Sequence, residues 1–418
     1  MSEDSVSARL LDLTRLISRA GRTLTGIDRV ELAYLKALVE QPAPAFGLIK
    51  SNLGYLLLDA AGMRALAARI EGDVAWGKAD RLSRAFSKLD KMQRRAQSDA
   101  RRLAIARSFR GGLKRLLRLH LPKGCAYINV GHSNFTDRVA DAVKQGAQGK
   151  IAVMVHDTIP LDHPLYQTPE AVVRFEHMLG RVREKADLVI YNSAATRRAA
   201  EGYMADWGGA PRGVVAHLGV EVATPEPGAL PKGVPPDGVY FVSVGTLEPR
   251  KNHMLLIEIW ERLVKQTPPQ EVPHLVICGH RGWKNEELFF RLDRSQLMGA
   301  YIHELPGLSD GAVAALLHGA AGALYPSFAE GYGLPMIEAA ASGVPVLCAD
   351  LPVYREVLGD YPVYASLKDS YLWQRRITAL AKSKTTDRRA GKQVSGDGAQ
   401  GFTPPAWQAH FKTVLKLT

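Results

Sequence analysis

The stretch Phe328-Ala329-Glu330-Gly331-Tyr332-Gly333-Leu334-Pro335-Met336-Ile337-Glu338 decides the predicted fold. The apolar run 321–325 before it predicts a buried strand, and the run 344–348 after it predicts the next one. Between them, Glu338-Ala339-Ala340-Ala341 consists of strong helix formers. Pro335 suits the first helical position because its missing N–H is not needed there. The pattern is therefore a strand–loop–helix–strand unit of a parallel α/β sheet.

Two carboxylates lie across this glycine-rich turn. Glu330 follows the strand at its carboxyl end, where open α/β sheets bind ligands, and Glu338 is expected to face the same cleft from the first helical turn. A carboxylate that accepts from two neighbouring sugar hydroxyls makes an oriented, charge-assisted contact. Gly331 and Gly333 allow close backbone approach and leave helix N–H groups for a phosphate. The alternative is that both glutamates only favour a helix N-terminus.

The same stretch resembles the E-x7-E signature of the retaining glycosyltransferases of family 4, which have the GT-B fold. A second segment, Val242-Ser243-Val244-Gly245-Thr246-Leu247-Glu248-Pro249-Arg250-Lys251-Asn252, resembles the G-T-x-E-P-R-K-N signature of the mannosyltransferase-like branch of that family. Weaker matches keep the family order at residues 25–29, 155–157, 187–193 and 217–220. The resemblance spans roughly residues 10–360.

The resemblance implies an α/β protein of the GT-B class, with two Rossmann-like domains facing a central cleft. A chain of 418 residues is long enough for two cores. We expect an N-terminal acceptor-binding domain over 1–222 and a linker rich in Pro and Gly over 223–238. A nucleotide-sugar-binding domain should occupy 239–400, and a C-terminal helix within 401–418 should cross back to the first domain. The polar tail 382–401 is expected to be irregular.

The cations of the second motif are predicted to act on the leaving group. Arg250 and Lys251 follow the strand 241–244 at its carboxyl end, where they would stabilise the departing diphosphate. The alternative is an ion pair of these cations with Glu248. By resemblance, Glu338 holds the ribose hydroxyls and Glu330 contacts the transferred sugar. Neither is assigned as a nucleophile, because retention in this family is usually described as a front-face reaction.

Three residues of the first domain complete the implied site. His156 ends the strand 151–155 and resembles the family histidine that approaches the donor sugar, either donating to a sugar hydroxyl or acting through its carbonyl. Its neighbour Asp157 is assigned to the acceptor hydroxyl. Gly26, in Thr25-Gly26-Ile27, resembles the N-terminal glycine loop that meets the diphosphate. The alternative for His156 is a buried histidine satisfied by backbone.

The remaining donor contacts are placed by topology and resemblance. Arg281 follows the strand 274–278 and is placed to reach phosphate or base, and Leu308 lies in the segment whose backbone would read the base. Gly245 and the loop residues Gly331, Tyr332, Gly333 and Leu334 are assigned to the donor as well. The sequence shows no D-x-D pair, so we expect neither a catalytic metal nor a cofactor besides the nucleotide-sugar substrate.

Charge and composition suggest where the protein works. Cys125, Cys278 and Cys348 lie in apolar runs without metal-ligand spacing, and the polar N-terminus is unlike a signal peptide, which together predict a cytoplasmic protein. Segment 78–123 contains 15 Lys or Arg against three Asp, an excess equal to the +12 of the whole chain. Leucines interleave with these cations, which predicts a basic amphipathic helix on the inner face of an anionic membrane. The alternative is a solvated helix face; no nucleic-acid motif is present.

The combined prediction is a retaining glycosyltransferase. It would transfer a hexose, mannose from GDP-mannose in the first instance, to a lipid-linked or polysaccharide acceptor in cell-surface glycan synthesis. Three alternatives stay open. They are a transferase that uses a UDP- or dTDP-sugar on a small soluble acceptor, a sugar-nucleotide epimerase of the same plan, and a catalytically silent sugar-binding scaffold.

Overall fold

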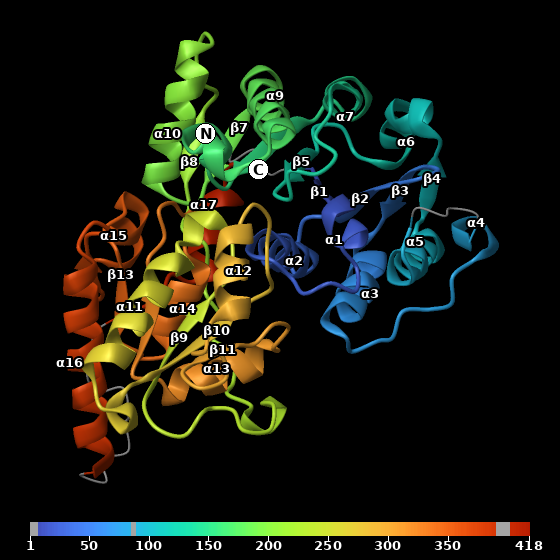
Figure 1. Cartoon of the computed structure of the whole chain (residues 1–418). Coiled ribbons are helices and arrows are strands. Elements are labelled where there is room, and N and C mark those ends of the chain that lie inside the picture. The colour runs from blue at the N-terminus through green and yellow to red at the C-terminus, as the bar shows by residue number, and fades with distance from the viewer. Residues whose placement is uncertain (1–6, 85–88, 390–401) are drawn as a thin grey trace. The chain divides into compact units, whose positions relative to one another are not determined.

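The chain divides into two compact units, each with its own sheet. The computed structural model describes residues 7–84, 89–389 and 402–418. Unit 1 comprises Met1–His156, Val173–Leu218 and Trp407–Thr418, and unit 2 comprises Asp157–Val172 and Gly219–Ala406. Helices flank both sheets (Figure 1). The segment 157–172 thus groups with the second unit, although the sequence analysis placed it in the first domain.

The sheet of unit 1 has the order β4-β3-β2-β1-β5-β6-β7-β8. Its strands are parallel except for β3, which pairs antiparallel with both β2 and the edge strand β4. The strands are β1 (Arg9–Asp12), β2 (Ala45–Ser51), β3 (Gly54–Leu58), β4 (Ala106–Ser108), β5 (Ala126–Asn129), β6 (Lys150–Val155), β7 (Leu188–Tyr191) and β8 (Gly213–Val215). β1, β5 and β7 are buried along their whole length, so the sheet is the centre of this core.

The helices of unit 1 follow or connect these strands. They are α1 (Thr14–Ser18), α2 (Gly26–Val39), α3 (Ala60–Glu71), α4 (Arg81–Arg84), α5 (Lys91–Leu103), α6 (Leu113–His120), α7 (Asp137–Ala142), α10 (Ala194–Asp206), α17 (Trp407–Val414) and most of α9 (Pro169–Lys185). The C-terminal helix α17 belongs to this unit: His410 is hydrogen-bonded to Tyr34 at 2.7 Å and to the carbonyl of Ala216 at 3.1 Å.

The sheet of unit 2 is parallel throughout, with the order β11-β10-β9-β12-β13-β14. Its strands are β9 (Tyr240–Val244), β10 (His274–Cys278), β11 (Ile302–Glu304), β12 (Gly322–Tyr325), β13 (Val346–Ala349) and β14 (Val363–Ala365). Its helices are α8 (Ile159–Asp162), α11 (His253–Gln266), α12 (Glu286–Arg294), α13 (Asp310–Gly319), α14 (Leu334–Ala341), α15 (Pro352–Leu358) and α16 (Ser370–Arg389). Two Rossmann-like α/β domains are therefore confirmed.

One helix extends further than expected. The tail 382–401 was predicted to be irregular, yet α16 continues to Arg389, and 390–401 lie outside the described residues. Trp373, Ile377 and Ala381 are buried at a spacing of four residues. This apolar stripe anchors α16 to the core of unit 2, and the polar composition of the tail hid its continuation.

The predicted basic amphipathic helix does not run through the whole segment, although the short helix α6 separates buried leucines from exposed cations. Segment 78–123 instead forms α5, the edge strand β4, a short 3-10 turn at Arg110–Gly112, and α6. The backbone becomes extended at Ala104, and β4 then pairs with β3, which places Arg107 opposite Leu56. Because the chain leaves the helix at this point, the leucines and cations of the segment do not share one helical face.

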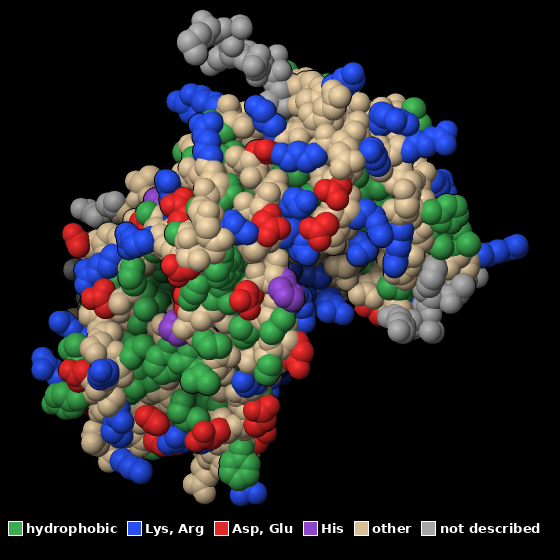
Figure 2. Space-filling view, turned by 90° about the horizontal axis from the view of Figure 1, so that it is seen from above, with side chains coloured by type: hydrophobic (Ala, Val, Ile, Leu, Met, Phe, Trp, Pro, Cys, Tyr) green, Lys and Arg blue, Asp and Glu red, His purple; other side chains and the backbone are tan. Residues whose placement is uncertain are grey.

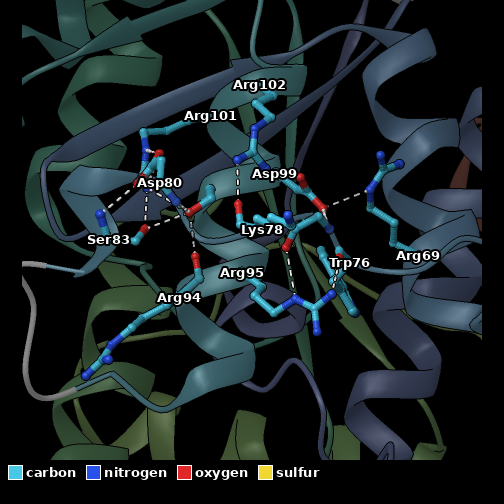
Figure 3. A network of polar contacts seen from close by, with 12 residues as sticks. Arg69, Trp76, Lys78, Asp80, Ser83, Arg94, Arg95, Asp99, Arg101 and Arg102 are labelled. Carbon is cyan, nitrogen blue, oxygen red and sulfur yellow. Dashed lines mark hydrogen bonds and ion pairs between the residues drawn. The ribbon is translucent and has the colours of Figure 1, made fainter.

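Two arginines of this segment, Arg101 and Arg102, form ion pairs within unit 1 (Figure 3). Arg101 is buried and donates to the Asp80 carboxylate through Nε at 2.9 Å and Nη2 at 2.7 Å. Asp99 is also buried, and it accepts from Arg69 Nε at 3.1 Å and from Arg102. These ion pairs fasten the stretch before α4 onto α5 (Figure 3). Part of the positive charge of the segment therefore stabilises unit 1 itself.

We expect Gly279→Ala to destabilise unit 2. Gly279 directly follows β10, and a Cβ there would lie 2.0 Å from the carbonyl oxygen of Gly245 at the end of β9. Because both groups are backbone, the two strand ends would have to separate, at a cost of about 1–3 kcal/mol. Urea unfolding should show the loss. Gly228→Ala is the matched control, since a Cβ added at Gly228 would meet no atom within 4 Å; equal stability of the two variants would contradict this account.

Candidate functional site

Charged residues of unit 2 gather where two neighbouring parallel strands end. β9 leads through Gly245 to the turn Pro249–Lys251, and β12 leads to the loop that contains Glu330. Because β9 and β12 pair in parallel, their carboxyl ends meet at the same edge of the sheet. The N–H of Phe328 donates to the carbonyl of Arg250 at 2.7 Å and ties the two loops together.

Glu330 is the centre of this group. Arg250 Nη1 donates to Glu330 Oε2 at 2.7 Å, and the Lys251 ammonium donates to Oε1. Ser327 Oγ also donates to Oε1, at 2.8 Å. Arg250 further donates through Nε to Glu248 Oε2 at 2.9 Å. The structure thus brings together the predicted Arg250, Lys251 and Glu330, and adds Glu248 and Ser327. The ion pair with Glu248, weighed as an alternative, exists alongside the pair with Glu330.

Burial and charge oppose each other at Glu330. Its side chain is only 6% exposed, and burial by itself would favour the neutral acid. Lys251 and Arg250 outweigh this effect and lower the pKa of Glu330 to about 2. Burial lowers the pKa of Lys251, partly offset by Glu330, whereas the charges of Glu330 and Glu248 outweigh burial and raise the pKa of Arg250. Glu330 is therefore an ionised carboxylate at any ordinary pH.

Hydrogen-bonding capacity remains in the cluster. Within the described parts of the chain, no hydrogen bond uses Arg250 Nη2, and only one of the three Lys251 donors has a partner. A carboxylate has about four acceptor positions, of which Glu330 uses three. The cluster can thus bind an anion through its cations and a hydroxyl through Glu330 at the same time.

The helix after Glu330 begins one residue earlier than predicted. α14 starts at Leu334, with Gly333 as its N-cap, so Pro335 is the second helical residue and Glu338 lies beyond the first turn. Gly333 has a φ of +92°, and a Cβ there would lie 2.9 Å from the ring of Tyr354. Both facts require glycine. Glu338 is half-buried near Tyr325, whose hydroxyl donates to the carbonyl of Pro335 at 2.9 Å.

The other predicted donor residues differ in their surroundings. Gly245 has a φ of +143° and lies against the Lys251 side chain. Tyr332 is buried, and Leu308 is half-buried just before the N-cap of α13. Arg281 directs its three guanidinium nitrogens to the carboxylates of Glu304 and Asp293, at 2.6–3.2 Å. This pairing favours a structural role for Arg281 over the predicted contact with the donor.

Asp157 belongs to unit 2 and accepts a hydrogen bond from the N–H of Ile159 at 3.1 Å. Burial raises its pKa, while the nearby Arg250 acts in the opposite direction. The carboxyl is therefore close enough to the Arg250–Glu330 cluster to interact with it electrostatically, although it does not bond to either residue.

His156 lies in unit 1, at the end of β6, and is 5% exposed. Its Nε2 contacts the carbonyl of Val130 at 2.6 Å, so Nε2 carries the proton and donates it. Burial lowers the pKa to about 3 and keeps the ring neutral. In this tautomer Nδ1, which makes no hydrogen bond with described residues, is an acceptor, and the contact of His156 with the donor sugar stays a prediction. The alternative, a buried histidine whose ring is hydrogen-bonded to backbone, describes Nε2.

The carbonyl of His156 is also engaged. Asn192, directly after β7, donates to it through Nδ2 at 2.7 Å.

Gly26 is the first residue of α2 and not part of a loop. It follows Thr25, which forms a capping box with Asp28. Asp28 has no exposed side-chain surface and accepts from Arg15 Nε at 2.7 Å and Arg19 Nε at 2.8 Å. Two half-buried cations are thus held beside Gly26.

Sequence reasoning missed a buried polar group in unit 1. Asp12 ends β1 and accepts from the hydroxyl of Tyr127 and from Asn134 Nδ2, both at 2.8 Å. Glu31 lies against Gly131, where a Cβ would be 1.9 Å from its Oε2. Burial and the charge of Asp12 raise the pKa of Glu31 well above its usual range. The signal that was available is the position of polar residues at strand ends: Asp12 and Asn129 are the last residues of β1 and β5, and His156 and Asn192 directly follow β6 and β7.

In the described ranges, no group of three or more His, Cys, Asp or Glu is arranged to hold a metal ion. The three cysteines are buried free thiols.

The part of the chain that carries this cluster is similar to known glycosyltransferases. Residues 231–395 match the family model described as glycosyl transferases group 1. The chain is 28% identical over 250 residues to the serotype-specific mannosyltransferase WbdA of Escherichia coli, which covers 56% of this chain and 30% of that protein. It is 36% identical over 130 residues to the O-antigen chain mannosyltransferase B of Escherichia coli, 31% of this chain and 33% of that protein. The chain spans about a third of the length of these curated relatives.

Solved structures agree on the fold. The Anabaena protein Alr3699/HepE, solved in complex with UDP and glucose, matches 98% of this chain and 99% of its own, with a TM-score of 0.62 and 15% identity. A trehalose-6-phosphate synthase matches 99% of both chains, with a TM-score of 0.56 and 14% identity. Both matches show the GT-B fold class for this chain.

We expect the ionised carboxylate of Glu330 to make the stability of the folded chain fall at low pH. The folded-state pKa of about 2 lies below the ordinary value of 4.5, so the stabilisation is complete above about pH 4.5 and is lost as the pH falls toward 2. The contribution of Glu330 to the free energy of unfolding should be about 2 kcal/mol smaller at pH 3 than at pH 6. Glu330→Gln should lower stability at pH 6, and the difference from the wild type should shrink at pH 3 in urea titrations.

Glu258→Gln is the matched control for this measurement. It removes a carboxylate from a solvent-exposed ion pair with Arg291, which should change stability by less than about 1 kcal/mol. A difference between wild type and Glu330→Gln that stays constant from pH 6 to pH 3 would show that Glu330 is not held ionised by Arg250 and Lys251.

Proposed function

We propose that this chain is a retaining glycosyltransferase of family 4 that transfers a hexose from a nucleotide sugar. The observation that carries the proposal is the buried Arg250–Glu330–Lys251 cluster at the carboxyl ends of β9 and β12. It lies in the region that matches the group 1 glycosyl transferase model. Two fixed cations with spare donors, held by a carboxylate with a spare acceptor, suit a substrate that joins a diphosphate to a sugar.

The cations are suited to the leaving group. As the bond between the sugar and the diphosphate breaks, negative charge grows on the phosphate oxygen. Arg250 Nη2 and the remaining Lys251 donors would bind that oxygen more strongly in the transition state than in the bound substrate. Glu330 keeps both cations fixed in advance, so little reorganisation is needed as charge develops.

Glu330 is better suited to binding than to nucleophilic attack. Both of its oxygens already accept from cations, and its low pKa marks a weakly basic carboxylate. A nucleophile would have to give up these contacts in order to bond to carbon. The arrangement therefore supports a front-face reaction over a covalent glycosyl-enzyme intermediate of the kind that retaining glycosidases form.

Mannose, from GDP-mannose, is the proposed sugar because the relatives are mannosyltransferases by name. The O-antigen chain relatives support a lipid-linked or polysaccharide acceptor in cell-surface glycan synthesis. The alternatives are a UDP- or dTDP-sugar with a small soluble acceptor, and a silent scaffold. The nucleotide preference separates the first of these from the proposal, and turnover separates the second.

Nucleotide binding should reveal the donor in a thermal-shift panel of GDP, UDP, dTDP and ADP with their common sugars. A ligand that binds only the folded chain stabilises it and so raises the melting temperature. At a ligand concentration of 100 times Kd the stabilisation is about 2.7 kcal/mol. We expect GDP and GDP-mannose to raise it by about 3 °C or more. Preference for UDP or dTDP would discard mannose, and no shift with any nucleotide would favour the scaffold.

Turnover should depend on the cluster itself. Lys251→Met keeps the aliphatic stem but removes the charge, so transfer from the donor found in the panel should fall about 100-fold or more. Lys368→Met removes an exposed charge of the same unit and is the control. Melting temperature and nucleotide binding of both variants show whether they are folded. Full activity of Lys251→Met would overturn the assignment of the site.

A further inference from the structure

We propose that the surface formed by β4 and α6 docks unit 1 on an anionic lipid bilayer. This docking surface is defined by Ile105, Arg107, Phe109, Arg110, Lys114, Arg115, Arg118 and Leu119. The inference extends the proposed function, because a membrane surface is where a lipid-linked acceptor would be presented, but its evidence comes from unit 1 alone.

The exposed side chains of this surface alternate between charge and apolar character. Phe109 is 82% exposed, Leu119 63% and Ile105 48%. Arg107, Arg110, Arg115 and Arg118 are exposed between them, and no Asp or Glu stands between Asp99 and Asp137. α5 and α6 are on the right in Figure 1, and on the same side of Figure 2 Lys and Arg side chains stand out and few acidic ones are visible.

Helix α6 separates its two faces clearly. Leu113, Leu116 and Leu117 are buried, and the backbone packs so closely on the turn 143–147 that a Cβ at Gly146 would lie 2.7 Å from the carbonyl oxygen of Lys114. The opposite face carries Lys114, Arg115, Arg118 and Leu119. Since the inward leucines already fix the helix, the outward Leu119 is not needed for folding.

These cations are not used inside the molecule. Among the described residues, Arg107, Arg110, Arg115 and Arg118 form no ion pair, and Lys114 bonds only to the Gln145 side chain, at 2.8 Å. In the preceding part of the basic segment, Arg101 is paired with Asp80, and Asp99 is paired with Arg102 and with Arg69 of α3 (Figure 3). Residues 105–123 therefore combine six Lys or Arg with no Asp or Glu, which is half of the +12 excess of the segment.

A bilayer matches both components of this surface. Anionic headgroups attract the cations, and the interface accepts Phe109, Leu119 and Ile105 without unpaired polar groups. A nucleic-acid backbone would satisfy the cations but leave the aliphatic side chains exposed. Phe109 is placed for insertion because it precedes a tight turn, in which the N–H of Gly112 donates to the Phe109 carbonyl at 2.9 Å.

The test is co-sedimentation of the full chain with vesicles of phosphatidylcholine, either alone or mixed equally with phosphatidylglycerol. The charge variant replaces Arg107, Arg110, Arg115 and Arg118 with Gln. The control replaces Lys150, Arg198, Arg212 and Lys412, four exposed cations elsewhere in unit 1, with Gln. We expect binding to mixed vesicles only, at least tenfold weaker for the charge variant and changed less than twofold for the control.

A second variant separates insertion from charge attraction. Phe109→Ser with Leu119→Ser keeps every charge, and binding should weaken several-fold, most visibly at 300 mM salt, where charge attraction is screened. Equal weakening by the charge variant and the control, or wild-type binding by both test variants, would overturn the proposal. Tighter binding of a single-stranded oligonucleotide than of vesicles, unchanged in the Phe109/Leu119 variant, would also overturn it.

Transfer to a soluble acceptor is measured on the same variants. If the docking proposal holds, the charge variant keeps this activity and loses vesicle binding. If the wild type binds vesicles but transfers no sugar, the proposed function fails and the docking surface stands.

Discussion

A buried carboxylate remains ionised only where fixed positive charge outweighs the loss of hydration, and Glu330 depends on that balance. Arg250 and Lys251 surround it, and without them Glu330 would be an uncompensated buried charge. The cluster also links the loop after β9 to the loop after β12. The sheet brings these loops to the same edge, and the charges then fix the side chains relative to one another. Any anion that binds there meets donors that are already oriented.

Much of this arrangement could be predicted from sequence because its signals are local. Apolar runs of four to six residues predicted the positions of β6, β7, β9, β10 and β12, and the charged residues in the loops after β9 and β12 marked the site. Contacts between loops were not predictable in this way. Phe328 donates to the carbonyl of Arg250, and Gly279 admits the end of β9, only because the strands are neighbours. Glu338 lies beyond the first turn of α14, not within it as predicted, and the cause is local. Gly333 adopts a left-handed conformation that lets α14 begin at Leu334.

The basic segment shows the limit of composition. Counting charges found the excess but not the partners of each arginine, so residues that face inward and residues that face outward looked alike. Asp80 and Asp99, only two acids, engage Arg69, Arg101 and Arg102 because the fold places these side chains next to one another. The polar group around Asp12 was missed for a related reason. Its strand, β1, has only four residues and contains Arg9, which is buried because it bonds to backbone carbonyls of Leu415 and Thr418.

The protonation states of the predicted catalytic residues narrow the chemistry that the chain can perform. Glu330, with a pKa of about 2, and His156, with a pKa of about 3, are respectively ionised and neutral throughout the physiological range. The His156 proton is donated to Val130, and Glu330 is occupied by cations, so neither is a strong general base. Under the proposed function, the acceptor proton must then go to another group. A departing phosphate oxygen beside Arg250 and Lys251 is a base that the substrate itself supplies, which is the requirement of a front-face transfer.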